Sequence, residues 1–479
     1  MRRWGGSARL EADQVLILVV ELGGSSIADP GRLSNASRII TDRVASGDRI
    51  AVVVSALPGV TDRLLEAAEH ACTGDQNHVK DLIEDVKSLH LGIAAACVEG
   101  GFGEDSIRSL RSLCEDLNRI LIGISYLREL TARSRDYVLS FGERLSTTIV
   151  YYLLRSKGLE AEYFLGGDCG VITDGNYGDA SPLYNVSKVE IRRILGPLLD
   201  AGIVPVVTGF VGKTQEGVVT TLGRGGSDYT ATLIGAALKA DEVWILGEVG
   251  GLMTADPRIE PNARIIRRLS YEEAMEMAHF RAKSIHPRAL EPAALTGIPV
   301  RIRSIYEWDD PGTVISREGG SPMVKAVTMI DNASMITVSG GGMMGAPGTA
   351  AKIFRVLGDQ GINILMISQS SSEVNISMVV PEEDLDRAVS ILEMAMLGKE
   401  NVREIKPEPS ISVISVIGEG MKGTVGIAAK VFGAVAENNI NVKMIAQGSS
   451  ETNISFVVDR SLGAKAVRAL HSRFNLDKI

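Results

Sequence analysis

The sequence predicts an α/β protein in which a mostly parallel sheet lies between helical layers and is followed by a duplicated, smaller module. Two observations predict this class. Apolar, β-branched segments alternate with segments of helical periodicity through roughly the first three hundred residues. In the remaining third, residues 343–380 match residues 421–458 without a gap, and 20 of the 38 positions are identical. At 479 residues the chain is also too long for one ordinary domain.

The elements of the first part alternate as strand and helix. Apolar stretches predict strands buried on both faces at residues 15–21, 50–55, 203–207 and 243–246. Helical periodicity predicts helices at residues 59–72, 78–98, 106–125, 140–157, 186–200 and 228–239. Such an alternation builds a parallel sheet covered on both faces, whose ligands bind at the carboxyl ends of the strands.

The two copies of the repeat have the same order of elements. A strand leads through a glycine-rich turn into a helix, and two further strands and a closing helix follow. The first strand and the two helices are expected at residues 334–339, 350–357 and 382–396, and again at residues 411–417, 428–435 and about 461–473. This order is that of a ferredoxin-like fold. The sequence does not show whether the tail at residues 475–479 adds a strand to either copy.

The composition is that of a globular protein without a polyanionic partner. The 50 basic and 59 acidic residues give a formal net charge of −9, so we expect no nucleic-acid partner. Hydrophobic residues make up 45% of the chain and charged residues 23%, which excludes a disordered chain. The apolar run at residues 15–20 is too short to cross a bilayer, and no apolar segment of a secretory signal follows Arg2 and Arg3. We therefore expect a cytoplasmic protein that binds no membrane.

The cysteines and histidines lack the spacings of known metal motifs. The four cysteines, at positions 72, 97, 114 and 169, form no zinc or redox motif, and we expect structural thiols in a reducing compartment. The six scattered histidines include no HExxH pair. We therefore expect no metal site built from protein ligands.

Three glycine-rich loops follow predicted strands. The first is Gly-Gly-Ser-Ser at residues 23–26, and the second, residues 221–228, leads directly into a helix whose N-terminus suits an anion. There Arg224 adds a charged fork, while Asp228 is either the N-cap or a functional carboxylate. The third loop covers residues 247–251. None has the spacing of a P-loop or of a dinucleotide-binding GxGxxG motif, so both are excluded.

Four motifs taken together resemble those of the aspartate kinases. They are TTLGRGGSDYTA at 220–231, MTADPRI at 253–259, FRAKSIHPRA at 280–289 and SFGERLS at 140–146. The resemblance implies an amino-acid-kinase domain over residues 1–315, and ACT domains over residues 325–405 and 406–479. It also implies transfer of the ATP γ-phosphate to the β-carboxylate of L-aspartate, the first step towards lysine, threonine and methionine. Because two anions meet in this reaction, the protein must supply positive charge and positioning.

The resemblance also implies roles for individual residues. Arg224 would hold a substrate carboxylate, and Glu143 the substrate ammonium; a solvated charge is the alternative for Glu143. The substrate would further contact Ser25, Gly225 and Ser227. The catalytic positions would be Gly24, Asp228 and Glu21, the last at the place of a family lysine. ATP, which brings its own Mg²⁺, would be bound by Gly23, Gly247, Glu248, Met253, Asp256, Arg258 and Lys283.

The repeat resembles the ACT-domain pair of enzymes that amino acids regulate. The resemblance implies that a small amino acid binds where the glycine turn meets a partner domain, and we expect lysine or threonine as the effector. It also implies a homodimer or homotetramer formed through these domains. The matching positions are Gly345, Asn363, Gln369, Glu373, Asn375, Asn441, Gln447 and Asn453. The alternative is that the repeated amides only satisfy the ends of strands.

The chain departs from this family at the expected catalytic centre. Family members have Lys-Phe-Gly-Gly-Thr-Ser where residues 21–26 are Glu-Leu-Gly-Gly-Ser-Ser, and the family's Thr-Asp-Val is Gly-Glu-Val at residues 247–249. The lysine stabilises phosphate, and two unit charges about 4 Å apart interact by roughly 4 kcal/mol at an effective dielectric constant of 20. Two hypotheses therefore remain: an active, feedback-regulated aspartate kinase, or a catalytically impaired regulatory paralogue that binds an amino acid.

Overall fold

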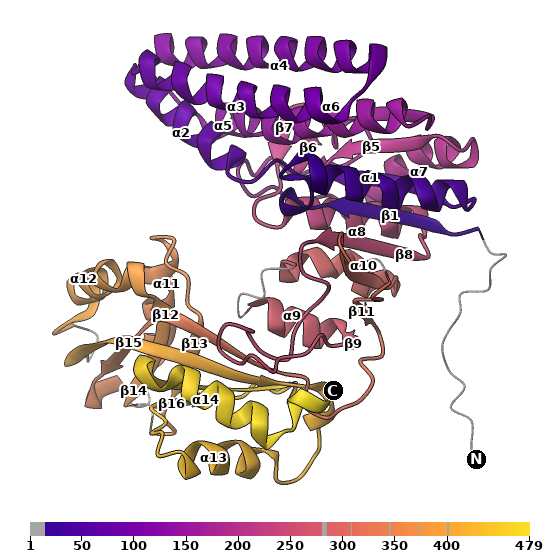
Figure 1. Ribbon diagram of the computed structural model, residues 1–479. Coiled ribbons are helices and arrows are strands. Elements are labelled where there is room, and N and C mark those ends of the chain that lie inside the picture. Colours follow the sequence, from indigo (N-terminus) through magenta and orange to yellow (C-terminus); the bar gives the residue numbers. More distant parts are fainter. Residues whose placement is uncertain (1–14, 280–284, 308, 344–345, 373, 400–401) are drawn as a thin grey trace, which may run out of the picture. The chain divides into compact units, whose positions relative to one another are not determined.

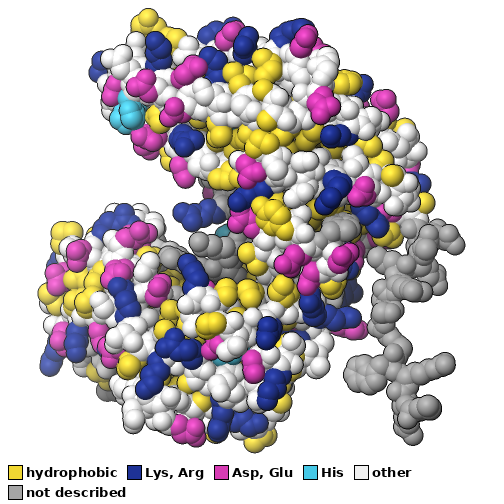
Figure 2. All heavy atoms as spheres, in the orientation of Figure 1, with side chains coloured by type: hydrophobic (Ala, Val, Ile, Leu, Met, Phe, Trp, Pro, Cys, Tyr) yellow, Lys and Arg dark blue, Asp and Glu magenta, His cyan; other side chains and the backbone are white. Residues whose placement is uncertain are grey.

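The computed structural model describes residues 15–279, 285–307, 309–343, 346–372, 374–399 and 402–479 (Figure 1). The chain forms two compact units, one of residues 1–251 and 284–317 and the other of residues 252–283 and 318–479. On the face seen in Figure 2, acidic and basic side chains are interspersed over each unit. No described helix has an apolar stretch long enough to span a bilayer.

A mostly parallel sheet, with strands in the order β3-β5-β2-β1-β8-β10-β11, forms the centre of the first unit. The neighbouring strands are parallel except for β10 and β11. The strands are β1 (Ile17–Leu22), β2 (Arg49–Val54), β3 (Ala161–Phe164), β5 (Val204–Thr208), β8 (Glu242–Gly247), β10 (Val300–Ser304) and β11 (Thr313–Ser316). The α/β class predicted from the sequence is therefore confirmed.

Helices cover both faces of this sheet (Figure 1). Leu18, Val20 and Leu22 of β1 join a core with α1 (Pro30–Ala45), α2 (Val60–Thr73), α3 (Gln76–Cys97), α4 (Gly100–Leu127), α5 (Ala132–Leu139) and α6 (Phe141–Ser156). Because side chains alternate along a strand, Val19 and Glu21 point to the opposite face, where α8 packs on β1. The other helices are α7 (Tyr184–Asp200), α8 (Gly226–Leu238) and α10 (Glu291–Thr296).

Short elements connect the sheet to the glycine-rich loops. The strands β4 (Ile172–Thr173), β6 (Val211–Thr214) and β7 (Val219–Thr221) form a small sheet just before α8. The 3₁₀ helix η1 (Gly24–Ile27) follows β1, and the 3₁₀ helix η2 (Pro287–Leu290) precedes α10. The sequence did not predict α5, because its eight residues include three charged side chains and only a short apolar stripe.

The second unit contains a six-stranded antiparallel sheet in the order β13-β14-β12-β15-β17-β16. Its strands are β12 (Ala326–Ser339), β13 (Met366–Gln369), β14 (Asn375–Pro381), β15 (Glu404–Ile417), β16 (Met444–Ala446) and β17 (Asn453–Asp459). Its helices are α11 (Thr349–Gly358), α12 (Leu385–Met396), α13 (Ile427–Glu437) and α14 (Arg460–Arg473). The same unit contains β9 (Arg268–Ser270) and α9 (Tyr271–His279), which lie within the range 1–315 predicted for the kinase domain.

Each repeat takes its fourth strand from the segment that precedes the other repeat. The first half of β12, residues 326–330, pairs with residues 413–417 of the second repeat, and residues 404–408 of β15 pair with residues 335–339 of the first. The first copy therefore has the βαββαβ order along the chain, whereas the second copy takes its last strand from residues 326–330, ahead of the first copy. The tail does not add a strand, because Leu476–Lys478 forms a 3₁₀ helix.

We predict that Val327→Ala destabilises the second repeat, although Val327 precedes the first repeat in the sequence. Val327 is fully buried in the core of the second repeat, and its truncation should cost about 1–3 kcal/mol. Hydrogen exchange should then accelerate in α13 and β17 but not in α11. Ile336→Ala, in the same strand but in the core of the first repeat, should show the reverse pattern. Acceleration in α11 by both variants would contradict the assignment of residues 326–330 to the second repeat.

Candidate active site

A cavity of about 480 Å³ lies beside the carboxyl ends of β2 and β5 and the start of α8, where ligands of parallel sheets commonly bind. It is lined by Ser55, Ala56, Thr61, Glu143, Gly178, Phe210, Gly223, Arg224, Gly225, Gly226, Ser227 and Asp228. It therefore brings together Glu143, Arg224, Gly225, Ser227 and Asp228, which the sequence assigned to the substrate or to catalysis. Arg224 is the only one of these lining residues with a positive charge.

Two glycines allow the loops around the cavity to approach closely. A Cβ atom on Gly24 would lie 2.6 Å from the carbonyl oxygen of Ala56. Gly225 has a φ of +71°, and a Cβ there would lie 2.2 Å from the Cβ of His286. Side chains at these two positions would displace backbone or a neighbouring residue. The glycine-rich loops are thus determined by close packing as well as by turn geometry.

Asp228 lies in the first turn of α8 and is not its N-cap. The N-cap position is Gly225, and no side chain caps this helix. The carboxylate of Asp228 instead accepts a hydrogen bond from the backbone amide of His286, although burial outweighs this bond and raises its pKa to about 7. Of the two interpretations of Asp228 that the sequence left open, the cap is wrong.

Glu143 lies in the first turn of α6 and is only 4% exposed. Its Oε1 accepts a hydrogen bond from the backbone amide of Ala56 at 3.3 Å. Its Oε2 has no hydrogen-bond partner among the described residues, and burial raises the pKa of Glu143 to about 8. The alternative that Glu143 is a solvated charge is therefore wrong. Its unpartnered Oε2 can accept a hydrogen bond from a ligand bound in the cavity.

Glu21 is completely buried at the end of β1. Its Oε1 accepts a hydrogen bond from the hydroxyl of Ser55 at 2.8 Å, whereas its Oε2 has no partner among the described residues. Burial, and secondarily the charge of Asp228, raise the pKa of Glu21 well above its usual value. The expected place of the family lysine thus holds a carboxyl group that strongly favours its protonated form.

Arg32 of α1 connects the first and third glycine-rich loops. Its Nη1 donates to the carbonyl oxygen of Ser25 at 3.0 Å and also forms an ion pair with Glu248. The hydroxyl of Ser304 donates to the carbonyl oxygen of Glu248 at 3.2 Å. Glu248 therefore has a cationic partner, unlike Glu21, and the two loops carrying Gly23 and Gly247 are held to one helix.

Sequence analysis missed Asp136, which organises one wall of the cavity. Asp136 is fully buried on α5, and its carboxylate accepts bonds from the backbone amides of Gly178 and Thr221, at 3.0 and 2.9 Å, and from the Thr221 hydroxyl at 2.9 Å. The partners are more than 40 residues away in sequence, so no local pattern signals this role.

The remaining residues assigned to the nucleotide lie in the second unit or outside the described residues. Met253, Asp256 and Arg258 belong to residues 252–283 of the second unit. Arg258 forms an ion pair with Asp256 at 2.5 Å, so this guanidinium is already partly neutralised. Lys283 lies outside the described residues.

The first repeat contains a cavity of about 340 Å³ at the start of α11. Of the described residues expected to bind an effector, Gln369 lines it, whereas Asn363 and Asn375 are exposed and do not. Gly345 and Glu373 lie outside the described residues. The cavity is lined by Met343, Ala346, Pro347, Gly348, Thr349, Ala350, Gln369 and Ile376.

In the second repeat, the expected amides have different surroundings. Asn441 and Gln447 are exposed, and the Nδ2 of Asn453 donates to the carboxylate of Glu276 on α9. The partner of Asn453 is a side chain 177 residues away and not the end of a strand, whereas Gln369 lines a cavity.

Comparisons with known proteins connect this architecture to one family. Residues 17–304 match the amino acid kinase family, and residues 336–396 and 414–474 each match the ACT domain. Chloroplastic aspartokinase 2 of Arabidopsis thaliana is 34% identical over 469 residues, which cover 96% of this chain and 84% of that protein. The chain spans only about half (51%) of the bifunctional aspartokinase/homoserine dehydrogenase 2 of the same plant, at 32% identity.

The fold is similar to that of Escherichia coli aspartokinase III. Its complex with aspartate and ADP superimposes with a TM-score of 0.79 at 27% identity, covering 95% of this chain and 99% of that one. Its complex with lysine and aspartate gives a TM-score of 0.80, covering 96% and 99%.

We predict that ionisation of Glu143 lowers stability as the pH rises. Since folding raises its pKa from 4.5 to about 8, the folded state holds this proton more tightly, and the free energy of unfolding should fall with pH across that window by up to about 1.4 kcal/mol per unit. Denaturant unfolding from pH 5 to 9 should show a shallower fall for Glu143→Gln than for the wild type. Glu162→Gln, at an exposed glutamate, should keep the wild-type slope, and an equal slope in all three proteins would contradict the prediction.

Proposed function

The chain belongs to the aspartokinases of the amino acid kinase family, and we propose that it transfers the γ-phosphate of ATP to the β-carboxylate of L-aspartate. The product would be 4-phospho-L-aspartate, the first intermediate towards lysine, threonine and methionine. The observation that carries this proposal is the cavity in which Arg224 and Glu143 occur together. The complex of a similar protein with aspartate and ADP supports the same choice of ligands.

The charges of the cavity suit an amino acid with an acidic side chain. The exposed guanidinium of Arg224 offers two parallel donors to a carboxylate. The unpartnered Oε2 of Glu143 offers an acceptor to an ammonium group. Because binding an ammonium favours the ionised carboxylate, we propose that Glu143 loses its proton when aspartate binds. Aspartate would thereby be oriented with its side-chain carboxylate free to attack.

The nucleotide would approach from the side of the first glycine-rich loop. Gly23 and Gly24 carry no side chains, and a Cβ on Gly24 would lie 2.6 Å from the carbonyl oxygen of Ala56. A glycine-rich loop of this kind suits the close approach of phosphate groups to the backbone. Magnesium ions, when bound with ATP, neutralise the charge of its phosphates. Gly247 and Glu248 would complete this side, with Arg32 holding Glu248 away from the phosphates.

Glu21 carries the second candidate function, that of a catalytically impaired paralogue which binds an amino acid. No described cation neutralises Glu21, and its buried carboxyl group lies within electrostatic range of Asp228. We propose that Glu21 is uncharged near neutral pH, so that the site lacks the family's cation without gaining a full negative charge. Phosphoryl transfer would then be slowed by the loss of one positive charge rather than by its replacement with a negative charge.

We predict that Glu21→Lys increases aspartate phosphorylation by at least about tenfold, since about 1.4 kcal/mol of added transition-state stabilisation has that effect. Glu21→Gln should leave the rate within about twofold, because it copies an uncharged carboxyl group. A coupled assay with aspartate, ATP and Mg²⁺ measures both variants beside the wild type.

The outcomes separate the two candidates. If the wild type binds the amino acid normally but phosphorylates aspartate no faster than background, the hypothesis of an active kinase is excluded. If Glu21→Lys does not phosphorylate aspartate faster than the wild type, the cause of impaired catalysis would lie at residues 247–248. A large gain in Glu21→Gln would show that Glu21 is ionised. Glu162→Gln serves as the control for a change of charge far from the cavity.

We further propose that the ACT repeats bind lysine or threonine and join chains into a homodimer or homotetramer. The cavity lined by Gln369 supports effector binding to the first repeat, and a similar protein has been crystallised with lysine. Ile367 and Ile445 are 44% and 47% exposed on the edge strands β13 and β16, which suits association through the sheets.

We predict that one of these two amino acids binds and that Gln369→Ala weakens its binding. Loss of a hydrogen bond to a charged ligand should cost about 1.5–3 kcal/mol, or roughly tenfold or more in affinity. Isothermal titration calorimetry with both amino acids measures this. Gln447→Ala, the equivalent change in the second repeat, is the matched variant. No heat with either amino acid would contradict the regulatory assignment.

A further inference from the structure

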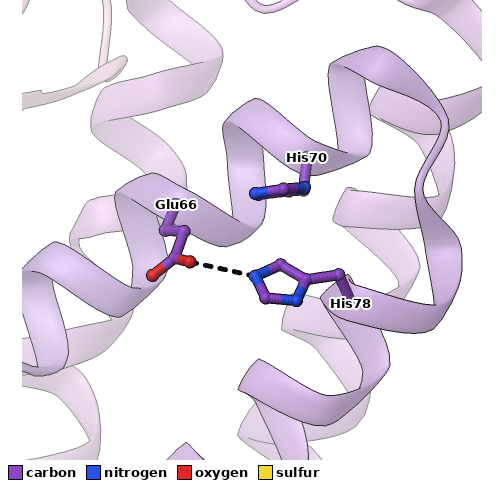
Figure 3. A group of neighbouring side chains, drawn as sticks. All are labelled: Glu66, His70 and His78. Carbon is purple, nitrogen blue, oxygen red and sulfur yellow. Dashed lines mark hydrogen bonds and ion pairs between the residues drawn. The ribbon is translucent and has the colours of Figure 1, made fainter.

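Three side chains that commonly bind metals meet at the surface of the hairpin formed by α2 and α3. Glu66 and His70 are four residues apart on α2 and therefore share one face of that helix. His78 belongs to the first turn of α3. Figure 3 shows the three side chains directed towards a common space between the two helices. One ligand atom from each lies within 4.8 Å of the others.

The three side chains of this cluster lie within contact distance of one another. The Nε2 of His78 lies 2.9 Å from the Oε1 of Glu66, and the ring centroids of His70 and His78 are 4.1 Å apart. An ion pair between Glu66 and His78 explains two of the three residues. The second imidazole adds a third ligand atom to the same space. Two imidazoles and one carboxylate around a common space are a ligand set that suits a divalent cation.

Asp75 provides an independent observation that points to a ligand at His70. It is the N-cap of α3, where its Oδ1 accepts a bond from the backbone amide of His78. Its Oδ2 lies 3.5 Å from the Nδ1 of His70. In many metal sites a carboxylate lies beside the ring nitrogen of a histidine that does not bind the metal, and Asp75 lies beside Nδ1 in this way. Asp75 thus orients His70 and fixes the start of the helix that carries His78.

The cluster is accessible and separate from the substrate cavity. The side chains of His70, His78 and Glu66 are 38%, 41% and 48% exposed, and Figure 2 shows histidine side chains at the surface of this helical end. None of the three lines the cavity, which α2 reaches through Thr61 in its first turn. A cation can therefore enter from solvent without crossing the active site.

We propose that Glu66, His70 and His78 bind one divalent transition-metal cation of the zinc type. Two imidazole nitrogens and one carboxylate oxygen suit Zn²⁺, Ni²⁺ or Cu²⁺, whereas Mg²⁺ prefers oxygen ligands alone. With metal–ligand bonds of about 2.0–2.2 Å, tetrahedral ligands lie roughly 3.3 Å apart. Rotation of these exposed side chains brings the three atoms to that spacing, and water takes the fourth position. The metal links α2 to α3.

Titration with zinc chloride, on the full chain freed of any affinity tag, tests the proposal. Calorimetry should show one Zn²⁺ bound per wild-type chain. His78→Ala and Glu66→Gln should each weaken this binding by about tenfold or more. Glu69→Gln is the matched control, since Glu69 is exposed on the same helix but is not one of the three ligands. It should bind zinc as the wild type does.

A second measurement separates loss of the site from loss of the fold. Without metal, the two ligand variants should melt at the wild-type temperature, because the side chains are at the surface. Excess zinc should raise the melting temperature of the wild type and of Glu69→Gln only. Absence of stoichiometric binding by the wild type, equal affinity in His78→Ala, or displacement of zinc by an equal concentration of Mg²⁺ would overturn the proposal.

Discussion

The character of the active site depends on one buried carboxyl group, that of Glu21. It lies at the carboxyl end of the central strand β1, on the face covered by α8. Its only hydrogen bond with a described residue is with the hydroxyl of Ser55, and burial together with Asp228 favours the protonated form. Under the proposed function, a group in this position would determine whether the phosphates of a nucleotide meet a cation, a neutral group or an anion, and hence how fast phosphoryl transfer can be.

The fold fixes this position through ordinary strand geometry. Alternation along β1 directs Leu22 into the helical core and Glu21 to the opposite side. The first turn of α8, held close by the glycines of its loop, then brings Asp228 towards the same region. Moving this carboxyl group elsewhere would require a different strand register, which the buried face of the sheet opposes. The departure from the family that the sequence motifs suggest would therefore be chemical and would leave the architecture unchanged.

The sequence was sufficient for the fold class and for five of the residues that line the cavity, but not for long-range partners. Periodicity predicted the parallel sheet and the repeats, and the motifs predicted that Glu143, Arg224 and Asp228 come together. Nothing local could show that Asp136 fixes the cavity wall, or that residues 326–330 complete the second repeat, because both depend on contacts across the chain. The spacing of Glu66, His70 and His78 matches no motif either, since a helical hairpin brings them together.

The protonation state of Glu21 is the most direct test of this account. Isotope-edited infrared difference spectra of the wild type and Glu21→Gln, with carboxyl-labelled glutamate at pH 7, isolate the band of this one side chain. A buried, protonated Glu21 should give the carbonyl stretch of a carboxylic acid, which shifts to a carboxylate band only at more alkaline pH. A carboxylate band already present at pH 7 would contradict it, and would show that a full negative charge stands at the end of β1.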